Sequence, residues 1–165
     1  SDVRQCAVIG TGPLGHLCAQ VLALKGHQVT AFDRNPQRLA YFKNSTISTS
    51  GDLERLNEFD ILIEVTGDPE ALDVILHESS AGATILLLGL PYAHRQFTFE
   101  NIVAFDKTVV GSVGSNGEDF EEAITLLPEL ETNAFTEKIL PLAEFRDAWE
   151  LVNARKHLKV ILEVS

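Results

Sequence analysis

The sequence predicts an α/β fold built on a doubly wound parallel sheet, because short β-rich runs alternate with longer helical stretches along most of the chain. Apolar residues fill the short runs almost continuously, as expected for strands that helices cover on both faces. Right-handed crossovers between such strands build one sheet. With 165 residues the chain is long enough for one domain with a substantial core.

Five strands and four helices follow from this alternation. The predicted strands are Gln5–Gly10, Gln28–Asp33, Asp60–Val65, Thr84–Gly89 and Thr108–Val113. Each predicted helix opens with a proline or with acidic residues, which a helix N-terminus favours. The predicted helices lie near Pro13–Lys25, Pro36–Phe42, Pro69–Ser79 and Glu118–Leu127.

Two regions depart from the regular pattern. Lys43–Glu58 is largely polar, with Ile47 as an apolar anchor, and we expect a short third strand and a turn of helix there. After Pro128 the pattern predicts a strand, an amphipathic helix and a last strand, at Phe135–Leu140, Ala143–Ala154 and Leu158–Val164. Because no linker is long enough to separate two domains, residues 1–165 are predicted to form a single domain.

The composition argues against several classes of partner. The net charge of −11 disfavours nucleic acid and anionic membranes, and no apolar run approaches the roughly 18 residues of a membrane span. Cys6 and Cys18 stand in apolar runs and are predicted to be small core residues, which suits a reducing cytoplasm. The chain contains no methionine, so we expect it to be a piece of a longer protein.

A glycine-rich turn joins the first strand to the first helix and matches the dinucleotide-binding (Rossmann) fingerprint. Gly10 would permit the tight turn, Gly12 would let the backbone approach a pyrophosphate, and Gly15 would let the helix pack closely on the strand. Free N–H groups and the helix dipole would then hold the pyrophosphate. The residues of this predicted loop are Gly10, Thr11, Gly12, Pro13, Leu14 and Gly15.

Asp33 ends the second predicted strand, where a carboxylate can accept hydrogen bonds from the ribose hydroxyls of the adenosine half. The same carboxylate would repel the 2′-phosphate of NADP, so NAD is the preferred cofactor and NADP the alternative. Arg34 and Arg38 either neutralise a 2′-phosphate or lie over the adenine, or they are solvated charges beside a helix.

Four other side chains have two interpretations each. His16 could contact a phosphate, but a packed or surface histidine is favoured. His94 and Arg95 could reach the nicotinamide or the substrate, although an exposed loop pair is somewhat favoured. Glu64 is either buried and hydrogen-bonded near the cofactor or turned towards a sheet edge.

The sequence contains no nucleophile elbow and no Walker lysine, so nothing in it supports a hydrolase or a nucleoside triphosphatase.

Several segments resemble the zinc-type medium-chain dehydrogenases, the relatives of alcohol, sorbitol, threonine and glucose dehydrogenases. Residues 10–15, 59–72 and 82–89 resemble the cofactor-binding domain of that family. Residues 135–142, 145–149 and 159–162 are similar to its C-terminal segment, so the resemblance covers nearly the whole chain. It implies an NAD(P)-linked oxidoreductase that moves a hydride between nicotinamide and a small hydroxyl or carbonyl substrate.

The resemblance also implies roles for particular residues. Thr66 and Gly67 would lie on the adenosine side of the cofactor. Gly89, Leu90 and Val113 would approach the nicotinamide. The edge strand 108–113 would be the surface through which two copies of the protein form a homodimer. The family's N-terminal domain, with its catalytic cysteine, histidine and acidic zinc ligands, has no counterpart in this sequence. We therefore assign no catalytic or metal residue, expect zinc in that missing domain if at all, and expect this chain alone to bind cofactor without turnover.

Two other function classes share part of the pattern. Regulatory NAD(H)-sensing modules, such as those that gate potassium channels, have a similar opening but do not resemble the second half of this chain. Methyltransferases also place a glycine loop and an acidic residue on their first two strands. They generally lack the third glycine at this spacing and a proline that opens the helix, so the dehydrogenase interpretation is favoured over both.

Overall fold

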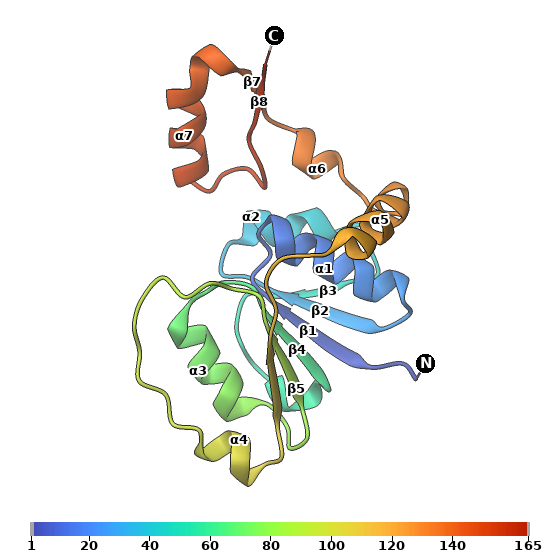
Figure 1. The fold of residues 1–165 in the computed structure, drawn as a ribbon, viewed down its shortest axis with the longest axis vertical. Helices are drawn as coiled ribbons and strands as arrows, with labels where there is room; N and C mark the ends of the chain where they lie inside the picture. Colours follow the sequence, from blue (N-terminus) through green and yellow to red (C-terminus); the bar gives the residue numbers. More distant parts are fainter. Residues whose placement is uncertain (1, 165) are drawn as a thin grey trace.

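The computed structural model describes residues 2–164 and centres on a six-stranded sheet of order β3-β2-β1-β4-β5-β6 (Figure 1). Every strand pairs in parallel with its neighbours, which confirms the predicted doubly wound α/β fold. The strand order reverses between β1 and β4, the point at which open α/β sheets bind ligands. The strands are β1 Gln5–Ile9, β2 Gln28–Phe32, β3 Ser48–Ser50, β4 Ile61–Glu64, β5 Thr84–Leu87 and β6 Thr108–Gly111.

The helices follow these strands along the chain. Those of the sheet domain are α1 Pro13–Leu24, α2 Pro36–Leu39, α3 Pro69–Glu78, α4 Glu100–Ala104 and α5 Gly117–Leu126. The side chains of Asn35 and Asp68 cap α2 and α3 by accepting hydrogen bonds from the N–H groups of Gln37 and Glu70. The prediction missed α4, which is one short turn. Within residues 2–164 no helix has the length and apolarity needed to cross a bilayer.

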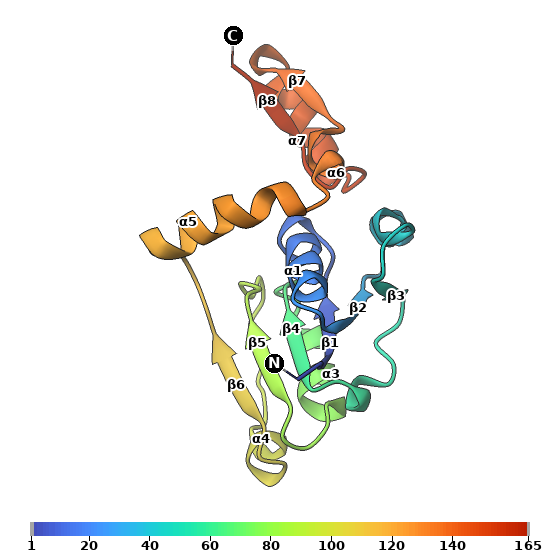
Figure 2. The same cartoon turned by 90° about the vertical axis from the view of Figure 1, so that its right-hand side faces the viewer.

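The core consists of two layers, one on each face of the sheet. Ala7 and Ile9 of β1 share a cluster with Ile75 of α3, whereas Cys6 and Val8 share the other cluster with Ala19 of α1. Figure 2 shows α1 and α3 on opposite sides of β1 and β4. Since alternate side chains of a strand point to opposite faces, burial on both faces requires the continuous apolar runs seen in the sequence.

Both cysteines lie in apolar surroundings. Cys6 is fully buried, and burial raises the pKa of its thiol to about 11, so the thiol is neutral at physiological pH. Cys18 is half-buried against the same cluster. Both positions agree with the prediction of small core residues.

The weakly patterned region folds as predicted, but the strands after Pro128 do not. Lys43–Glu58 contains β3 and a 3-10 turn, η2 Leu56–Glu58, and Ile47 is buried. The predicted strand Phe135–Leu140 is wrong in its first half, because Asn133–Thr136 forms helix α6 and strand β7 is confined to Ile139–Pro141. The predicted strand Leu158–Val164 shortens to β8, Ile161–Glu163.

The C-terminal segment forms a small unit of its own beside the sheet domain. It contains β7, helix α7 Phe145–Asn153 and β8, and its two strands pair in parallel as a separate sheet. Figure 1 shows this unit at the top of the view, above α2. Hydrogen bonds attach it and its connecting loop to the sheet domain, through the pairs Gln20–Glu131 (2.7 and 3.1 Å), Tyr41–Glu137 (2.8 Å) and Asn35–Arg155 (3.3 Å).

His16 lies in the contact between α1 and this connecting region. Its ring is packed among three aromatic rings, with centroids 4.6 Å from Phe42, 5.6 Å from Phe135 and 6.0 Å from Tyr41. The ring atom Nδ1 is buried without a hydrogen-bond partner, and burial lowers the pKa of His16 although Glu131 partly opposes this shift. His16 is therefore packed, one of the two arrangements, packed or surface, that the sequence favoured over a phosphate contact, and Phe135 contacts it from helix α6.

This burial predicts a pH-dependent stability. Below the ordinary histidine pKa of 6.5 the unfolded chain takes up a proton that the folded protein resists at His16, so the free energy of unfolding falls as the pH falls. Above that pH the ring is neutral in both states and this contribution is constant. Urea unfolding between pH 8 and pH 5 should show that the free energy of unfolding falls more steeply with falling pH in the wild type than in His16→Gln. Equal slopes would contradict the prediction.

Candidate cofactor site

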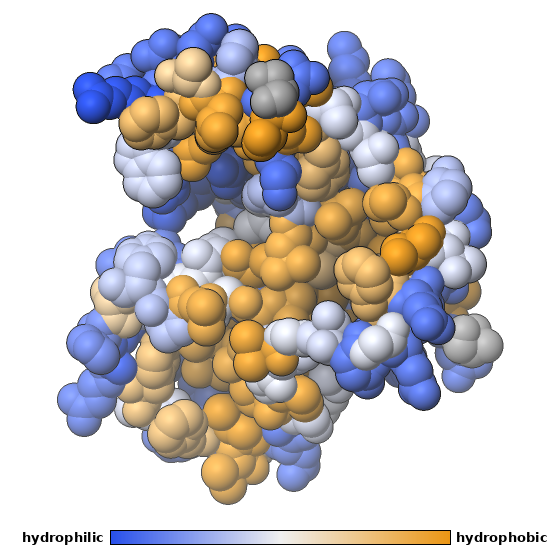
Figure 3. All heavy atoms as spheres, turned by 45° about the horizontal axis from the view of Figure 1, so that its top comes forward, coloured by the Kyte–Doolittle hydropathy of each residue, from blue (hydrophilic) through white to orange (hydrophobic). Residues whose placement is uncertain are grey.

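A cleft of about 960 Å³ lies at the carboxyl ends of β1, β2 and β4. Its volume is within the range of about 300–1,000 Å³ that is usual for small-molecule and cofactor sites. The molecule is visibly hollowed on the left of Figure 3, between its upper and lower parts. Of the predicted site residues, those that line the cleft are Gly10, Gly12, Asp33, Arg34, Arg38 and Thr66.

The three glycines of the loop serve different purposes. Gly10 has a φ of +97°, and a Cβ there would lie 2.6 Å from Cγ2 of Thr66. A Cβ on Gly15 would overlap the carbonyl oxygen of Gly10, so α1 can approach the loop closely only with glycine at this position. At Gly12 the nearest atom to an added Cβ is Nη1 of Arg38, at 3.9 Å. Gly10 and Gly15 thus allow the fold, whereas Gly12 leaves the cleft open.

The N-terminus of α1 provides hydrogen-bond donors beside this open space. Gly12 is the N-cap residue, no side chain caps the helix, and Pro13 occupies its first turn. The first N–H groups of a helix have no acceptor within it, and the helix dipole adds positive potential there. An anionic group over Gly12 would satisfy these donors. The shape and the donors therefore fit a pyrophosphate.

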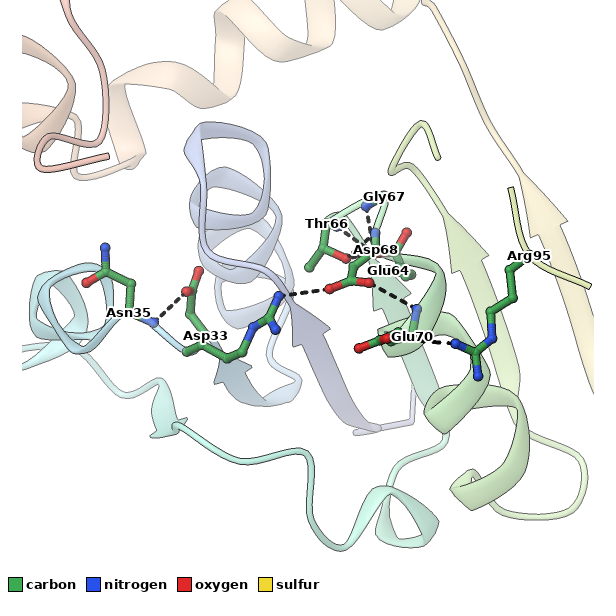
Figure 4. A network of polar contacts seen from close by, with 9 residues as sticks. Asp33, Asn35, Glu64, Thr66, Gly67, Asp68, Glu70 and Arg95 are labelled. Carbon is green, nitrogen blue, oxygen red and sulfur yellow. Dashed lines mark hydrogen bonds and ion pairs between the residues drawn. The ribbon is translucent and has the colours of Figure 1, made fainter. Parts of the chain in front are cut away.

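Asp33 holds the glycine loop in place. Its Oδ2 accepts hydrogen bonds from the N–H and hydroxyl of Thr11, at 2.8 and 2.9 Å, and its Oδ1 accepts one from the N–H of Asn35 at 2.8 Å. Figure 4 shows the contact with Asn35. A carboxylate oxygen can accept two hydrogen bonds, so Oδ1 keeps one lone pair for a ribose hydroxyl.

Arg34 and Arg38 are both engaged with carboxylates at the cleft. The Nη2 atom of Arg34 donates to Asp68 across the cleft at 2.8 Å, from an otherwise exposed side chain. Nη1 of Arg38 lies 3.6 Å from Oδ2 of Asp33, and its Nε is buried without a partner. Both arginines line the cleft and lie beside its carboxylates, Arg38 largely buried and Arg34 largely exposed.

Glu64 holds the turn after β4. Of the two environments that the sequence left open for it, the structure has the buried, hydrogen-bonded one. The residue is buried, and its Oε1 accepts hydrogen bonds from the N–H and the hydroxyl of Thr66 and from the N–H of Gly67 (Figure 4). The hydroxyl of Thr66 also accepts a bond from the N–H of Asp68. This network fixes the turn that carries Thr66 into the cleft.

The remaining predicted site residues do not line the cleft. Thr11 is a fully buried residue of the loop, whereas Val113 is 87% exposed. Gly67 has a positive φ and its Cα packs against the carbonyl of Leu90, so these two residues bring the turns after β4 and β5 together. The predicted site residues outside the cleft are Thr11, Pro13, Leu14, Gly15, Gly67, Gly89, Leu90 and Val113.

Several lining residues were not predicted from the sequence. Tyr92 follows β5, and Val152 and Arg155 come from the end of α7 and the turn after it. No local sequence signal identifies the last two, because they reach the cleft through the packing of the C-terminal unit. The hydrogen bond from the Asn35 side chain to the carbonyl of Arg155 could not be predicted from spacing either.

His94 and Arg95 line a second hollow of about 360 Å³ next to the main cleft. Arg95 donates to Asp73 at 2.8 Å, and its other terminal nitrogen lies 4.0 Å from Glu70. The two hollows share the Arg34–Asp68 ion pair as a wall. Among residues 2–164 no group of three or more metal-ligating side chains is placed to hold a metal ion.

Comparisons with known proteins agree on one family. A family model described as "Zinc-binding dehydrogenase" matches residues 13–129. Glucose 1-dehydrogenase of Thermoproteus tenax is 30% identical over 183 residues, covering 100% of this chain and 52% of that protein. Sorbitol dehydrogenase of Halalkalibacterium halodurans is 30% identical over 173 residues, covering 94% of this chain and 50% of that protein.

A solved structure shows the same fold. Haloferax mediterranei glucose dehydrogenase in complex with NADP, Zn and gluconolactone superposes with a TM-score of 0.80 at 21% identity, covering 100% of this chain and 52% of that one. The present chain therefore spans about half the length of the proteins that it resembles.

Proposed function

Because this chain belongs to the zinc-binding dehydrogenase family, we propose that it is the cofactor-binding part of an NAD(P)-dependent oxidoreductase. The observation that carries the proposal is the cleft above Gly12, where an uncapped helix N-terminus and an open backbone adjoin a carboxylate at the end of the next strand. NAD(H) is the proposed cofactor on account of Asp33, and NADP(H) is the alternative.

The residues of this chain would bind and orient the dinucleotide. In this proposal the pyrophosphate lies over Gly12 and the first turn of α1, and the adenosine ribose lies at Asp33. The nicotinamide would extend past Thr66 towards Gly89, Leu90 and Val113. When bound, the nicotinamide supplies hydride transfer chemistry, and the protein supplies position and electrostatics.

The substrate and the catalytic groups would belong to the rest of the full-length protein. The family and the named relatives support a small alcohol, polyol or sugar hydroxyl, or the corresponding carbonyl, as the substrate class. Phe145, Trp149 and Val152 form an exposed apolar face on α7, which suits a surface that another part of the protein covers. The chain by itself would bind cofactor without turnover, and any zinc would lie outside it.

Calorimetric titration with NADH tests the proposal. We expect saturable binding to the wild type and at least about tenfold weaker binding to Asp33→Ala, because the variant loses an acceptor for ribose and the anchor of Thr11. Glu118→Ala is the control, since it removes the same charge from an exposed helical turn away from the cleft. Absence of NADH and NADPH binding to the wild type would overturn the proposal.

We further propose that β6 forms a homodimer by pairing with the same strand of a second copy. β6 is the edge strand of the sheet, and Val110 on it is 45% exposed. The N–H groups of Thr108 and Ser112 donate to β5, so the alternate N–H of Gly111 points to the open edge.

Gly111→Pro therefore removes an outward donor without removing a bond to β5, and an added Cβ meets no atom within 4 Å. In sedimentation equilibrium we expect a dimer for the wild type and for Gly111→Ala, and a monomer for Gly111→Pro. A monomeric wild type, or a dimeric proline variant, would contradict this prediction.

A further inference from the structure

One ion pair bridges the cofactor cleft from side to side. Nη2 of Arg34 lies 2.8 Å from Oδ2 of Asp68, and both residues line the cleft. Arg34 follows β2 and Asp68 follows β4, while β1 lies between these two strands in the sheet. The bond therefore passes over the carboxyl end of β1, where the glycine loop begins. In Figure 4 the dashed line that reaches Asp68 from the residue next to Asp33 marks this pair.

The two partners are held in place to very different degrees. Asp68 is fixed, because its side chain is only 10% exposed and its Oδ1 accepts a hydrogen bond from the N–H of Glu70 as the N-cap of α3. Its own N–H donates to the hydroxyl of Thr66. The side chain of Arg34 is 82% exposed, and among residues 2–164 its guanidinium is bonded to Asp68 alone. Arg34 can therefore move away while Asp68 stays in place.

The strength of this ion pair allows it to open. Ion pairs with an exposed partner contribute little to stability, because solvent screens the charges and a long side chain must be held in one geometry. A closed form that depends on such a pair outnumbers the open form by no more than about fivefold, the factor that corresponds to about 1 kcal/mol. The pair is thus a reversible contact.

The closed pair narrows the cleft at the place that the proposed adenosine half must occupy. Arg34 adjoins Asp33, the proposed ribose position. The 2.8 Å between guanidinium and carboxylate leaves no room for a base, which would need roughly 3.5 Å of contact distance on each of its two faces. The same pair forms the wall between the main cleft and the second hollow of about 360 Å³. Opening the pair would join the two spaces beside Asp33.

We infer that the Arg34–Asp68 pair is an autoinhibitory latch, which is closed in this structure and which the adenosine half of the dinucleotide opens on entering the cleft. The inference rests on the proposed function, because it assigns a regulatory contact to the same site. Since only the open form accepts the cofactor, the apparent association rate constant equals that of the open form multiplied by the fraction of open protein. Dissociation starts from the open, occupied cleft, so the latch leaves its rate constant unchanged.

Asp68→Asn tests the inference with little effect on the fold, because asparagine caps a helix about as well as aspartate does. Its amide oxygen keeps the N-cap hydrogen bond, but its NH₂ group is not an acceptor for Arg34. Association and dissociation of NADH would be measured by stopped-flow fluorescence. We expect Asp68→Asn to raise the association rate constant by about three- to fivefold and to change the dissociation rate constant by less than about 1.5-fold.

Two matched variants separate the latch from the general effect of charge. Glu70→Gln removes a carboxylate that also lines the cleft and whose cationic partner, at 4.0 Å, is Arg95 instead of Arg34. Asp73→Asn breaks the ion pair with Arg95, which has the same length of 2.8 Å and lies outside the main cleft. Each of these variants should change the association rate constant of NADH by less than about twofold.

The possible outcomes distinguish the latch from the proposed function. If Asp68→Asn binds NADH no faster than the wild type does, or no faster than Glu70→Gln does, the latch is wrong and the proposed function stands. Tighter binding that comes only from slower dissociation would also contradict the latch, because the effect would then lie in the bound state. If neither NADH nor NADPH binds to any of these proteins, the proposed function and the latch are both overturned.

Discussion

Gly15→Ala is expected to destabilise the protein by about 3 kcal/mol and to abolish cofactor binding. The added Cβ would overlap the carbonyl oxygen of Gly10, and Val8 lies behind it at 3.5 Å, so neither the loop nor the helix can yield easily. Relief requires α1 to move away from β1, which opens the core layer that contains Ala19. Urea unfolding followed by circular dichroism measures this loss.

Gly12→Ala is the matched comparison, because both variants add one methyl group to the same loop. At Gly12 the methyl group meets no atom closer than 3.9 Å, so the expected cost is within about 1 kcal/mol, mainly from alanine's poor N-cap preference. The added methyl group stands where the backbone would meet the pyrophosphate, so the affinity for NADH should still fall. Equal losses of stability in the two variants would refute the division of roles between these glycines.

Local sequence patterns predicted the sheet domain well because its elements depend on short-range effects. The continuous apolar runs of β1 and β4 follow from burial on both faces, and Pro13, Pro36 and Pro69 each occupy the first turn of a helix as expected. The glycine loop was also predictable, because close backbone approach and a positive φ exclude side chains. Each of these signals lies within a few residues of the feature that it predicts.

The remaining features depend on contacts between distant parts of the chain. Phe135 lies in a segment that the sequence predicted as a strand, yet it packs on the ring of His16 from within a short helix. Val152 and Arg155 reach the cleft because the C-terminal unit attaches near Asn35, more than a hundred residues earlier. Spacing along the sequence carries no information about such contacts.

Glu64 illustrates a residue whose role a sequence leaves open. A carboxylate in an apolar strand is expensive to bury unless it is hydrogen-bonded, which is why two environments were equally acceptable. The structure supplies three donors within three residues of Glu64, all from the turn that follows. The carboxylate of Glu64 therefore stabilises the turn, although its backbone belongs to the strand.

We expect Glu64→Ala to lower the free energy of unfolding by about 4 kcal/mol, the second large effect predicted for this chain. The substitution leaves the N–H groups of Thr66 and Gly67 without their acceptor, the second of them in a buried position, and it creates a cavity in place of the buried Glu64 side chain. Since Thr66 lines the cleft, NADH affinity should also fall at temperatures where the variant remains folded. Thermal and urea unfolding, followed by titration of the folded fraction, measure both effects.

Glu64→Gln distinguishes the loss of the acceptor from other consequences of the change. Its amide oxygen can replace Oε1 as the acceptor for Thr66 and Gly67, so about 1 kcal/mol or less should be lost if these hydrogen bonds stabilise the turn. An equal loss in the glutamine and alanine variants would mean that the second carboxyl oxygen, which packs against Gly89, matters instead. In that case the contact between the turns after β4 and β5, rather than the hydrogen bonds to Oε1, would hold Thr66 in the cleft.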